Sequence, residues 1–185
     1  MSTSGDYAPM DECADEKRLH TLVLGYGNVD RGDDGLGYHV VNEIAHRLAH
    51  IELEPYGDAP TMVADGIGLL FQRQLMPEMA ELLAQFERVV FVDAHTGAFA
   101  EELRVVRVEP KYVPQALTHH LSPETLLYLT KEMHGCYPAA HLYSARGYQF
   151  DFCNHLSERT AVLAEQVVDG ILALMTQFCD GMSGV

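Results

Sequence analysis

The sequence predicts a three-layer α/β/α sandwich with a mostly parallel sheet of about five strands and an additional edge strand. Short apolar, β-rich runs alternate with amphipathic helical patterns along the chain, and such alternation is typical of a parallel sheet covered by helices on both faces. A chain of 185 residues with 48% hydrophobic side chains can fill one such domain but is short for two. We therefore expect a single domain over residues 20–180, preceded by a disordered acidic leader over residues 1–19.

The first half of the chain contains two predicted strand-helix units and a third strand. Residues 22–24 form a buried apolar run, and the helix that follows has its apolar residues spaced along one face. Residues 69–75 are the second predicted strand, and Pro77 begins a second helix, where its missing N–H is harmless. The apolar run at residues 88–94 is the clearest strand in the sequence.

The second half of the chain continues the alternation. Residues 103–110 alternate polar and apolar side chains, which favours an edge strand. A helix is expected from the N-cap Ser122 to the stop at Gly135. Residues 140–148 are the last predicted strand, and Ser157 caps a closing amphipathic helix.

Charge and cysteine content exclude several classes of protein. A formal net charge of −15 argues against nucleic acid or an anionic membrane surface as a partner, because both would be repelled. The N-terminus does not resemble a signal peptide, and no apolar run approaches the roughly 20 residues that span a bilayer. The four cysteines form no CxxC pair, so neither a zinc knuckle nor a disulfide framework is expected. We expect a soluble, cytoplasmic protein with reduced thiols.

The glycine-rich turn after the first strand favours a cation over a phosphate. Asp30 occupies the position of the third glycine of a dinucleotide-binding fingerprint, and Asp33 and Asp34 stand where a Walker loop would have Lys and Ser or Thr. Two carboxylates would repel a phosphate even at a positive helix end. The alternative role for these acids is helix capping, which would satisfy Asp33 and leave Asp34 spare.

Two further side chains are expected at the same edge of the sheet. Asp93 follows four apolar strand residues, where it either caps the turn at residues 95–97 or joins a site. His119 and His120 come shortly before the cap of the next helix. Ligands bind at the carboxyl ends of the strands in sheets of this kind, and two carboxylates with one imidazole suit an open divalent metal site.

These residues also carry a family resemblance. The segment GYGNVDRGDDGLG at residues 25–37, followed by RVVFVDA and THHLSPETLLYL, resembles the hydrogenase maturation proteases, and the likeness covers residues 21–175. The resemblance implies an endopeptidase that removes a short C-terminal extension from the precursor of the nickel-iron hydrogenase large subunit. It also implies that Asp34, Asp93 and His119 contact nickel and serve catalysis, with His120 as the alternative histidine.

The resemblance further implies that the nickel belongs to the substrate. The partner would be the nickel-loaded precursor, and the ion would not be permanently bound to the protease. Two other functions stay open from the sequence, a non-catalytic nickel-sensing chaperone of hydrogenase assembly and a Rossmann-like nucleotide-binding module. A cysteine protease is disfavoured because neither Cys136 nor Cys153 lies in a recognisable nucleophile turn.

Overall fold

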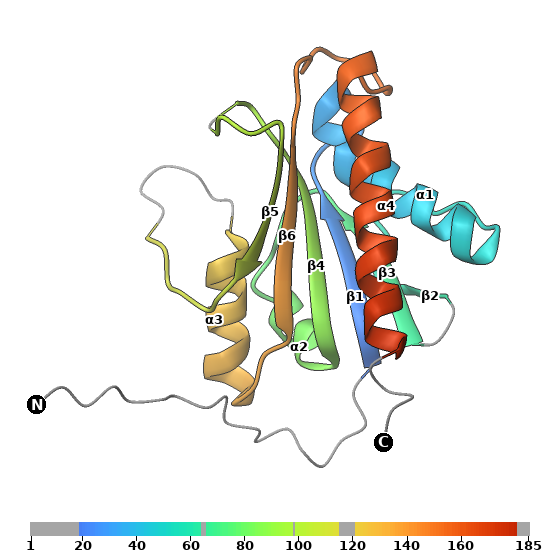
Figure 1. Cartoon of the computed structure of the whole chain (residues 1–185). Helices are drawn as coiled ribbons and strands as arrows, with labels where there is room; N and C mark the ends of the chain where they lie inside the picture. Colours follow the sequence, from blue (N-terminus) through green and yellow to red (C-terminus); the bar gives the residue numbers. More distant parts are fainter. Residues whose placement is uncertain (1–18, 64–65, 98, 115–120, 181–185) are drawn as a thin grey trace, which may run out of the picture.

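A six-stranded sheet runs through the centre of the computed structural model, which describes residues 19–63, 66–97, 99–114 and 121–180 (Figure 1). The strands are β1 (Leu19–Tyr26), β2 (Thr61–Met62), β3 (Ile67–Gln72), β4 (Phe86–His95), β5 (Leu103–Val108) and β6 (Ala139–Arg146). Their order across the sheet is β2-β3-β1-β4-β6-β5. The four inner strands are parallel, and the two outer strands pair antiparallel to their neighbours. The predicted mostly parallel sheet is confirmed, with one more antiparallel edge than expected.

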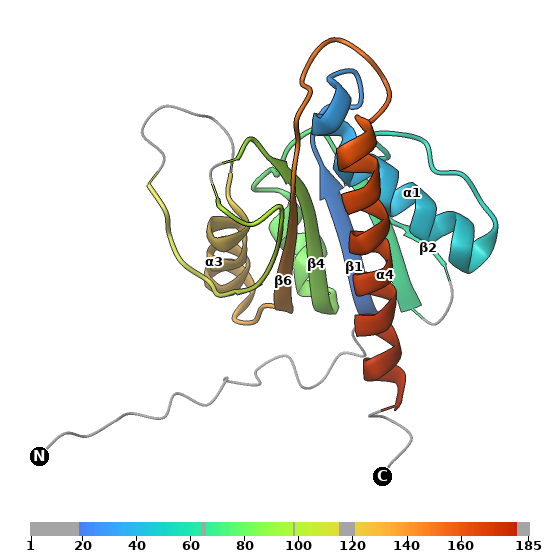
Figure 2. The same ribbon diagram turned by 45° about the horizontal axis from the view of Figure 1, so that its top comes forward.

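Helices cover both faces of this sheet. They are the short 3-10 helix η1 (Gly32–Gly35) and the α-helices α1 (Leu36–Ala49), α2 (Met79–Ala84), α3 (Pro123–His134) and α4 (Glu158–Asp180). Helices α1 and α4 pack against each other on one face, whereas α2 and α3 pack together on the other (Figures 1 and 2). The predicted three-layer sandwich is therefore confirmed.

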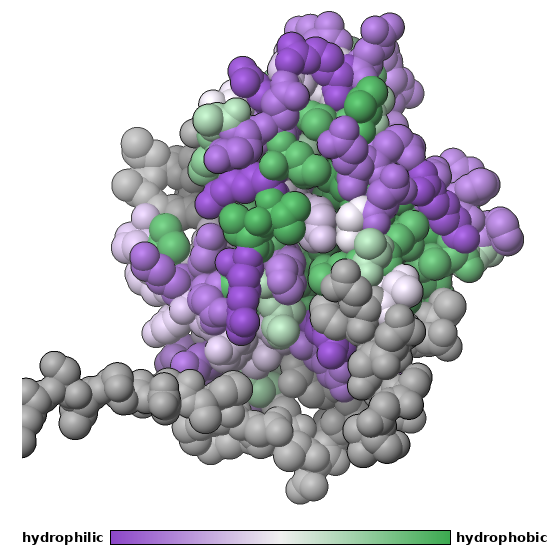
Figure 3. Space-filling view, in the orientation of Figure 1, coloured by the Kyte–Doolittle hydropathy of each residue, from purple (hydrophilic) through white to green (hydrophobic). Residues whose placement is uncertain are grey.

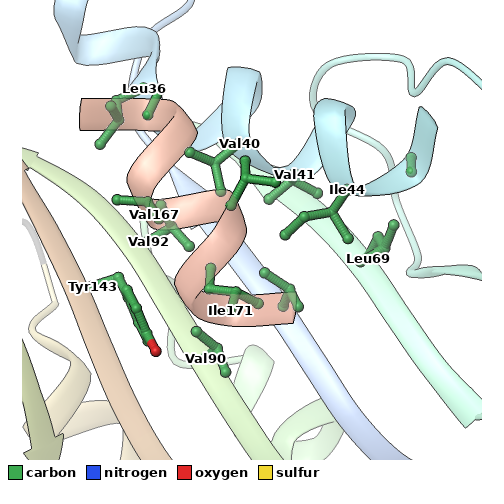
Figure 4. Packing of buried hydrophobic residues seen from close by; sticks show 14 of the residues in the cluster. Leu36, Val40, Val41, Ile44, Leu69, Val90, Val92, Tyr143, Val167 and Ile171 are labelled. Carbon is green, nitrogen blue, oxygen red and sulfur yellow. The ribbon is translucent and has the colours of Figure 1, made fainter. Parts of the chain in front are cut away.

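The larger core lies between the sheet and the α1–α4 layer (Figure 4). The apolar face predicted for the first helix is buried there, and residues from β4 meet it from the sheet side. Full burial of one such aliphatic side chain contributes about 1.5–3 kcal/mol. The fully buried residues that Figure 4 labels include Leu36, Val40, Val41, Ile44, Val92, Val167 and Ile171.

Helix α3 begins and ends as its sequence predicts. The Ser122 side chain accepts a hydrogen bond from the backbone N–H of Thr125 at 3.3 Å. Gly135 ends the helix with a φ of 73°, in the left-handed conformation that glycine adopts without strain. The predicted cap of α4 is also present, because Ser157 Oγ accepts a hydrogen bond from the N–H of Thr160 at 3.4 Å.

Several predicted boundaries were wrong. Strand β3 ends at Gln72, and Leu75 beyond it is buried in the core under α2 rather than in the sheet. Helix α2 begins at Met79, two residues after Pro77. The two-residue strand β2 was not predicted, because its exposed residues have no hydrophobic pattern and it exists only by pairing with β3.

The thiol prediction also needs a correction. Cys136 is disulfide-bonded, whereas Cys153 is a free thiol, so the expectation of reduced cysteines fails at Cys136. No helix within the described residues is long and apolar enough to cross a membrane. The expected leader, residues 1–19, lies outside the described residues except for Leu19, with which β1 begins.

Candidate functional site

The glycines of the turn between β1 and α1 allow two backbones to cross closely. A Cβ atom on Gly25 would lie 2.4 Å from the carbonyl oxygen of Gly37, and one on Gly27 would lie 2.0 Å from that of Asp34. Gly27 also has a φ of 139°, which L side chains rarely adopt. These glycines therefore hold the backbone of Asp34 against the end of β1, and no phosphate is needed to explain them.

Asp33 ties this turn to the start of α4. It is fully buried, and its carboxylate accepts hydrogen bonds from the backbone N–H groups of Tyr148, Gln149 and Ser157 at 2.7–2.9 Å. The hydroxyls of Ser157 and Thr160 also donate to it, at 2.8 and 2.7 Å. Burial opposes ionisation of Asp33, but these hydrogen bonds outweigh it and hold its pKa below the ordinary value.

Neither acid of the turn caps its own helix. The N-cap of α1 is Gly35, and no side chain donates or accepts a capping hydrogen bond there. Asp33 is satisfied, as the capping alternative required, but its donors come from residues more than 100 positions away. Asp33 is thus a structural residue, and Asp34 is the acid of the turn that can serve a site.

Asp93 lies beside Tyr26 and close to Asp34. The parallel register pairs Gly25 with Val92, which brings Tyr26 next to Asp93 on the same edge of the sheet. The Tyr26 hydroxyl donates a hydrogen bond to the Asp93 carboxylate. Burial and the negative charge of Asp34 raise the pKa of Asp93 to about 7, although hydrogen bonds from Tyr26 and the Ala94 N–H oppose the rise.

The structure thus brings together two of the three predicted site residues. Asp93 does not cap the turn that follows it, because β4 continues to His95 and the His95 ring accepts the N–H of Gly97 instead. The pKa of Tyr26 is raised well above its ordinary value by burial and by the charge of Asp93. The two carboxylates and the phenol form a partly desolvated acidic group at the carboxyl edge of the sheet.

Solved structures of the same shape are known. A [NiFe] hydrogenase maturation protease, HycI from Thermococcus kodakarensis, superposes with a TM-score of 0.60 at 23% identity over 86% of this chain and 94% of its own. The hydrogenase maturating endopeptidase HybD from E. coli gives 0.62 at 16% identity, over 86% and 93%. An endopeptidase from Escherichia coli gives 0.61 at 19% identity, over 90% and 95%. The chain has the fold of the hydrogenase maturation proteases.

The similarity to these solved structures establishes the fold of the chain. What reaction the chain could catalyse depends on the residues at its own site. No family model and no curated protein sequence matches the chain. The predicted ligands His119 and His120 lie outside the described residues, and the described chain resumes at Leu121. Within the described part, no three His, Cys, Asp or Glu side chains are arranged to hold a metal ion.

The start of α3 lies near the acidic pair of the hydrogenase maturation protease fold. Glu124, in the first turn of that helix, is close enough for its charge to raise the pKa of Tyr26. The first turn of α3 therefore lies on the same side of the sheet as Tyr26 and Asp93. The participation of a histidine just ahead of α3 stays a prediction, because His119 and His120 lie outside the described residues.

Sequence reasoning missed a second polar group on this edge, formed by His95, Arg104 and Arg146. Burial lowers the pKa of His95, and the nearby guanidiniums of Arg146 and Arg104 lower it further, while the backbone carbonyls of Glu102 and Glu101 favour the charged ring. Period-2 alternation places His95 on the same face of β4 as Asp93, which was a usable signal. The two arginines come from β5 and β6, and only the strand order reveals that they meet β4.

Proposed function

We propose that the chain is a cytoplasmic endopeptidase that removes a short C-terminal extension from the precursor of a nickel-iron hydrogenase large subunit after nickel insertion. Two observations support this, the shared fold with proteins named as hydrogenase maturation proteases and the sequence motif around Asp34. The observation that carries the proposal is the juxtaposition of Asp34 and Asp93 at the carboxyl edge of the sheet.

The acidic pair is suited to a cation. Asp93 is partly withdrawn from water and faces a second negative charge, so its ionised form is disfavoured in the free protein. A divalent cation between the two carboxylates would remove that repulsion and favour ionisation. Tyr26 donates a hydrogen bond to Asp93 and so fixes the direction in which the carboxylate presents its other lone pairs.

We propose that the cation is the nickel of the precursor. Two carboxylates and one imidazole, with no thiolate, form an incomplete set for a borderline metal such as nickel. The cysteines of the precursor would supply the remaining ligands, so that only a nickel-loaded precursor fills the site. This is how the enzyme would recognise that nickel insertion is complete.

The third contact from the enzyme is proposed to be His119. It lies three residues ahead of the α3 cap in the sequence, and the first turn of α3 is near Tyr26. His120 is the alternative, because the doubled histidine leaves the register open by one residue. Comparing His119→Ala with His120→Ala assigns the role, since only the ligand's loss should stop processing.

Asp93 also has the acid-base properties of a group that works at neutral pH. Its pKa of about 7 allows it to accept a proton near physiological pH, whereas an ordinary Asp would be a much weaker base. These properties belong to Asp93 before the precursor binds; contact with the precursor's nickel would lower this pKa and fix Asp93 as a carboxylate ligand. Asp34 contributes charge and positioning.

The test is incubation of purified nickel-loaded precursor with the enzyme, followed by intact-mass spectrometry. The wild type should shorten the precursor at its C-terminus, while Asp34→Asn and Asp93→Asn should leave its mass unchanged. Asp30→Asn is the matched control, because it makes the same change at an exposed position of the same turn. An unchanged mass with the wild type would favour the nickel-sensing chaperone instead. Equal trimming of a nickel-free precursor would exclude nickel as the recognition element.

A further inference from the structure

A group of cationic side chains shares the face of the sheet that carries Asp93, near the carboxyl ends of the parallel strands. His95 is two residues beyond Asp93 on β4, and the parallel register pairs it with Arg146 of β6. Arg104 of β5 pairs with Ser144, which in turn pairs with Asp93. Residues in register, and residues two apart on a strand, share a face. Three cationic or donor side chains from three adjacent strands therefore gather on the face of the sheet that carries Asp93.

Among the described residues, the Nε2–H of His95 is a buried donor without an acceptor in hydrogen-bonding geometry. Its side chain is 7% exposed, and its Nδ1 accepts the N–H of Gly97 at 3.2 Å, so Nε2 carries a hydrogen whether the ring is neutral or charged. Nε2 has no hydrogen-bond partner among the described residues. The backbone of Glu101 and Glu102 is nearby but does not meet Nε2 in hydrogen-bonding geometry. A buried unpaired donor costs free energy, which an acceptor from a ligand would recover.

The two arginines are half-buried, and the charge of Arg146 acts on one carboxylate, that of Glu102, whose pKa it helps to lower. The guanidinium of Arg104 lies 4.1 Å from the centre of the Phe99 ring, and that of Arg146 lies 5.2 Å from the centre of the Tyr148 ring. Within the described part of the chain, neither forms an ion pair. The nearest acid, Glu102, is already engaged by Arg159 and by the hydroxyl of Tyr148.

Arginines that form no ion pair with any described residue are unexpected in this chain. It has 27 acidic residues and only 12 lysines and arginines, so carboxylates are abundant. Hydrophilic residues cover most of the upper end of the molecule in Figure 3. This is the end at which the parallel strands have their carboxyl ends in Figure 1. Aromatic rings hold both guanidiniums in place, which reduces the entropy lost when they bind a planar anion.

We infer that Arg104, Arg146 and His95 form a carboxylate-binding site for the peptide substrate, next to the bond that is cut. This inference rests on the proposed endopeptidase function. The carboxylate is either the C-terminal carboxylate of the substrate or an Asp or Glu side chain near the cleavage point. Guanidinium groups bind such oxygens in pairs of charge-assisted hydrogen bonds, and the His95 N–H provides a third donor.

The strand spacing gives the reach of the site. Neighbouring strands are about 4.8 Å apart and residues advance about 3.3 Å along a strand, which puts the two arginine Cα atoms about 8–10 Å from that of Asp93. An extended peptide covers about 3.3–3.6 Å per residue. The bound carboxylate therefore belongs within about three residues of the scissile bond.

The first experiment tests binding without proteolysis. Nitrogen-labelled protein is titrated with N-acetyl-trialanine bearing a free carboxylate, with its C-terminal amide, and with an N-acetyl-Ala-Glu-Ala amide. A carboxylate-bearing peptide should shift the ring resonances of His95 and the Nε–H signals of Arg104 and Arg146, while trialanine amide should not. The free-acid and Glu peptides distinguish the two sources of carboxylate. Equal shifts from the neutral amide, or none from either carboxylate peptide at millimolar concentration, would overturn the inference.

Variants connect this binding to processing. Arg104→Gln and Arg146→Gln, singly and together, should abolish the shifts and raise the KM for the precursor by about tenfold or more, with a smaller change in kcat. Arg107→Gln is the matched control, because Arg107 is an exposed arginine of the same strand on its opposite face, paired with Glu109. Peptide binding without any trimming by the wild type would refute the protease proposal and leave the carboxylate site standing. Trimming with an unchanged KM in the double variant would refute the site alone.

Discussion

Replacing Asp93 with Asn should make the protein more stable at pH 8 while it abolishes processing. Burial and the charge of Asp34 raise the pKa of this carboxyl from 3.8 to about 7. Ionisation of Asp93 at pH 8 therefore lowers the free energy of unfolding of the protein. Asn has nearly the same size, and its amide oxygen still accepts hydrogen bonds from the Tyr26 hydroxyl and the Ala94 N–H. The amide cannot ionise, so the variant is free of this destabilisation.

The size of the gain follows from linkage. The unfolded chain loses this proton near pH 3.8 and the folded chain near pH 7, so between those values the folded state binds more protons and its stability falls as pH rises. At about 1.36 kcal/mol per pH unit, the Asn variant gains up to about 4 kcal/mol at pH 8 and about 2 kcal/mol at pH 5.5. Both are upper bounds, because Asp93 is half-buried and water screens part of the effect.

Urea unfolding of the two proteins at pH 8 and pH 5.5 measures this difference, and both conditions stay above the sequence pI of about 4.9. The variant should unfold at higher urea, with the larger advantage at pH 8, and should leave the precursor uncut. Asp30→Asn, at an exposed position, should shift neither transition. If the variant were no more stable than wild type at pH 8, ionisation of Asp93 would not destabilise the folded protein. Asp93 and Asp34 would then have no unfavourable charge for a cation to relieve.

Three other changes test the site's architecture. Asp33→Asn should destabilise the protein by about 3 kcal/mol, because an amide cannot replace a carboxylate that accepts from five donors; an unchanged urea midpoint would contradict its structural role. The stabilisation from Asp33 should be complete above pH 3.8 and be lost as pH falls through its lowered pKa. Gly27→Ala should cost about 2 kcal/mol or more and reduce processing, since its Cβ would lie 2.0 Å from the Asp34 carbonyl oxygen; wild-type thermal melting would refute this. Asp34→Asn should lower the pKa of Asp93, as followed by carboxyl-carbon NMR, and no movement would mean that the two acids do not interact.

Local signals predicted the local structure well. Ser122 and Gly135 mark the ends of α3 in the sequence and in the fold, because a cap depends only on neighbouring backbone groups. The prediction that Asp33 is satisfied within the fold was also confirmed. Its stated reason was wrong, since the donors to Asp33 come from residues 148–160, which no local pattern links to the turn.

Features that depend on strand order could not be predicted. The last strand in the sequence, β6, lies inside the sheet between β4 and β5, so Arg104 and Arg146 reach the edge that Asp93 occupies. Nothing in the alternating pattern of residues 103–110 indicates which strand they pair with. The predicted meeting of Asp34 and Asp93 required only that both follow neighbouring parallel strands, and this part of the site was accessible from the sequence.

The hydrogen bonds to Asp33 also determine when the turn can form during synthesis of the chain. The turn that carries Asp34 leaves the ribosome early, but the groups that hold its neighbour in place, at Tyr148, Ser157 and Thr160, leave more than 100 residues later. Until they arrive, the buried carboxylate has no donors and the turn is not fixed against the sheet. A nascent or truncated chain without the start of α4 therefore lacks the hydrogen bonds that fix Asp33, the neighbour of Asp34, in the folded turn.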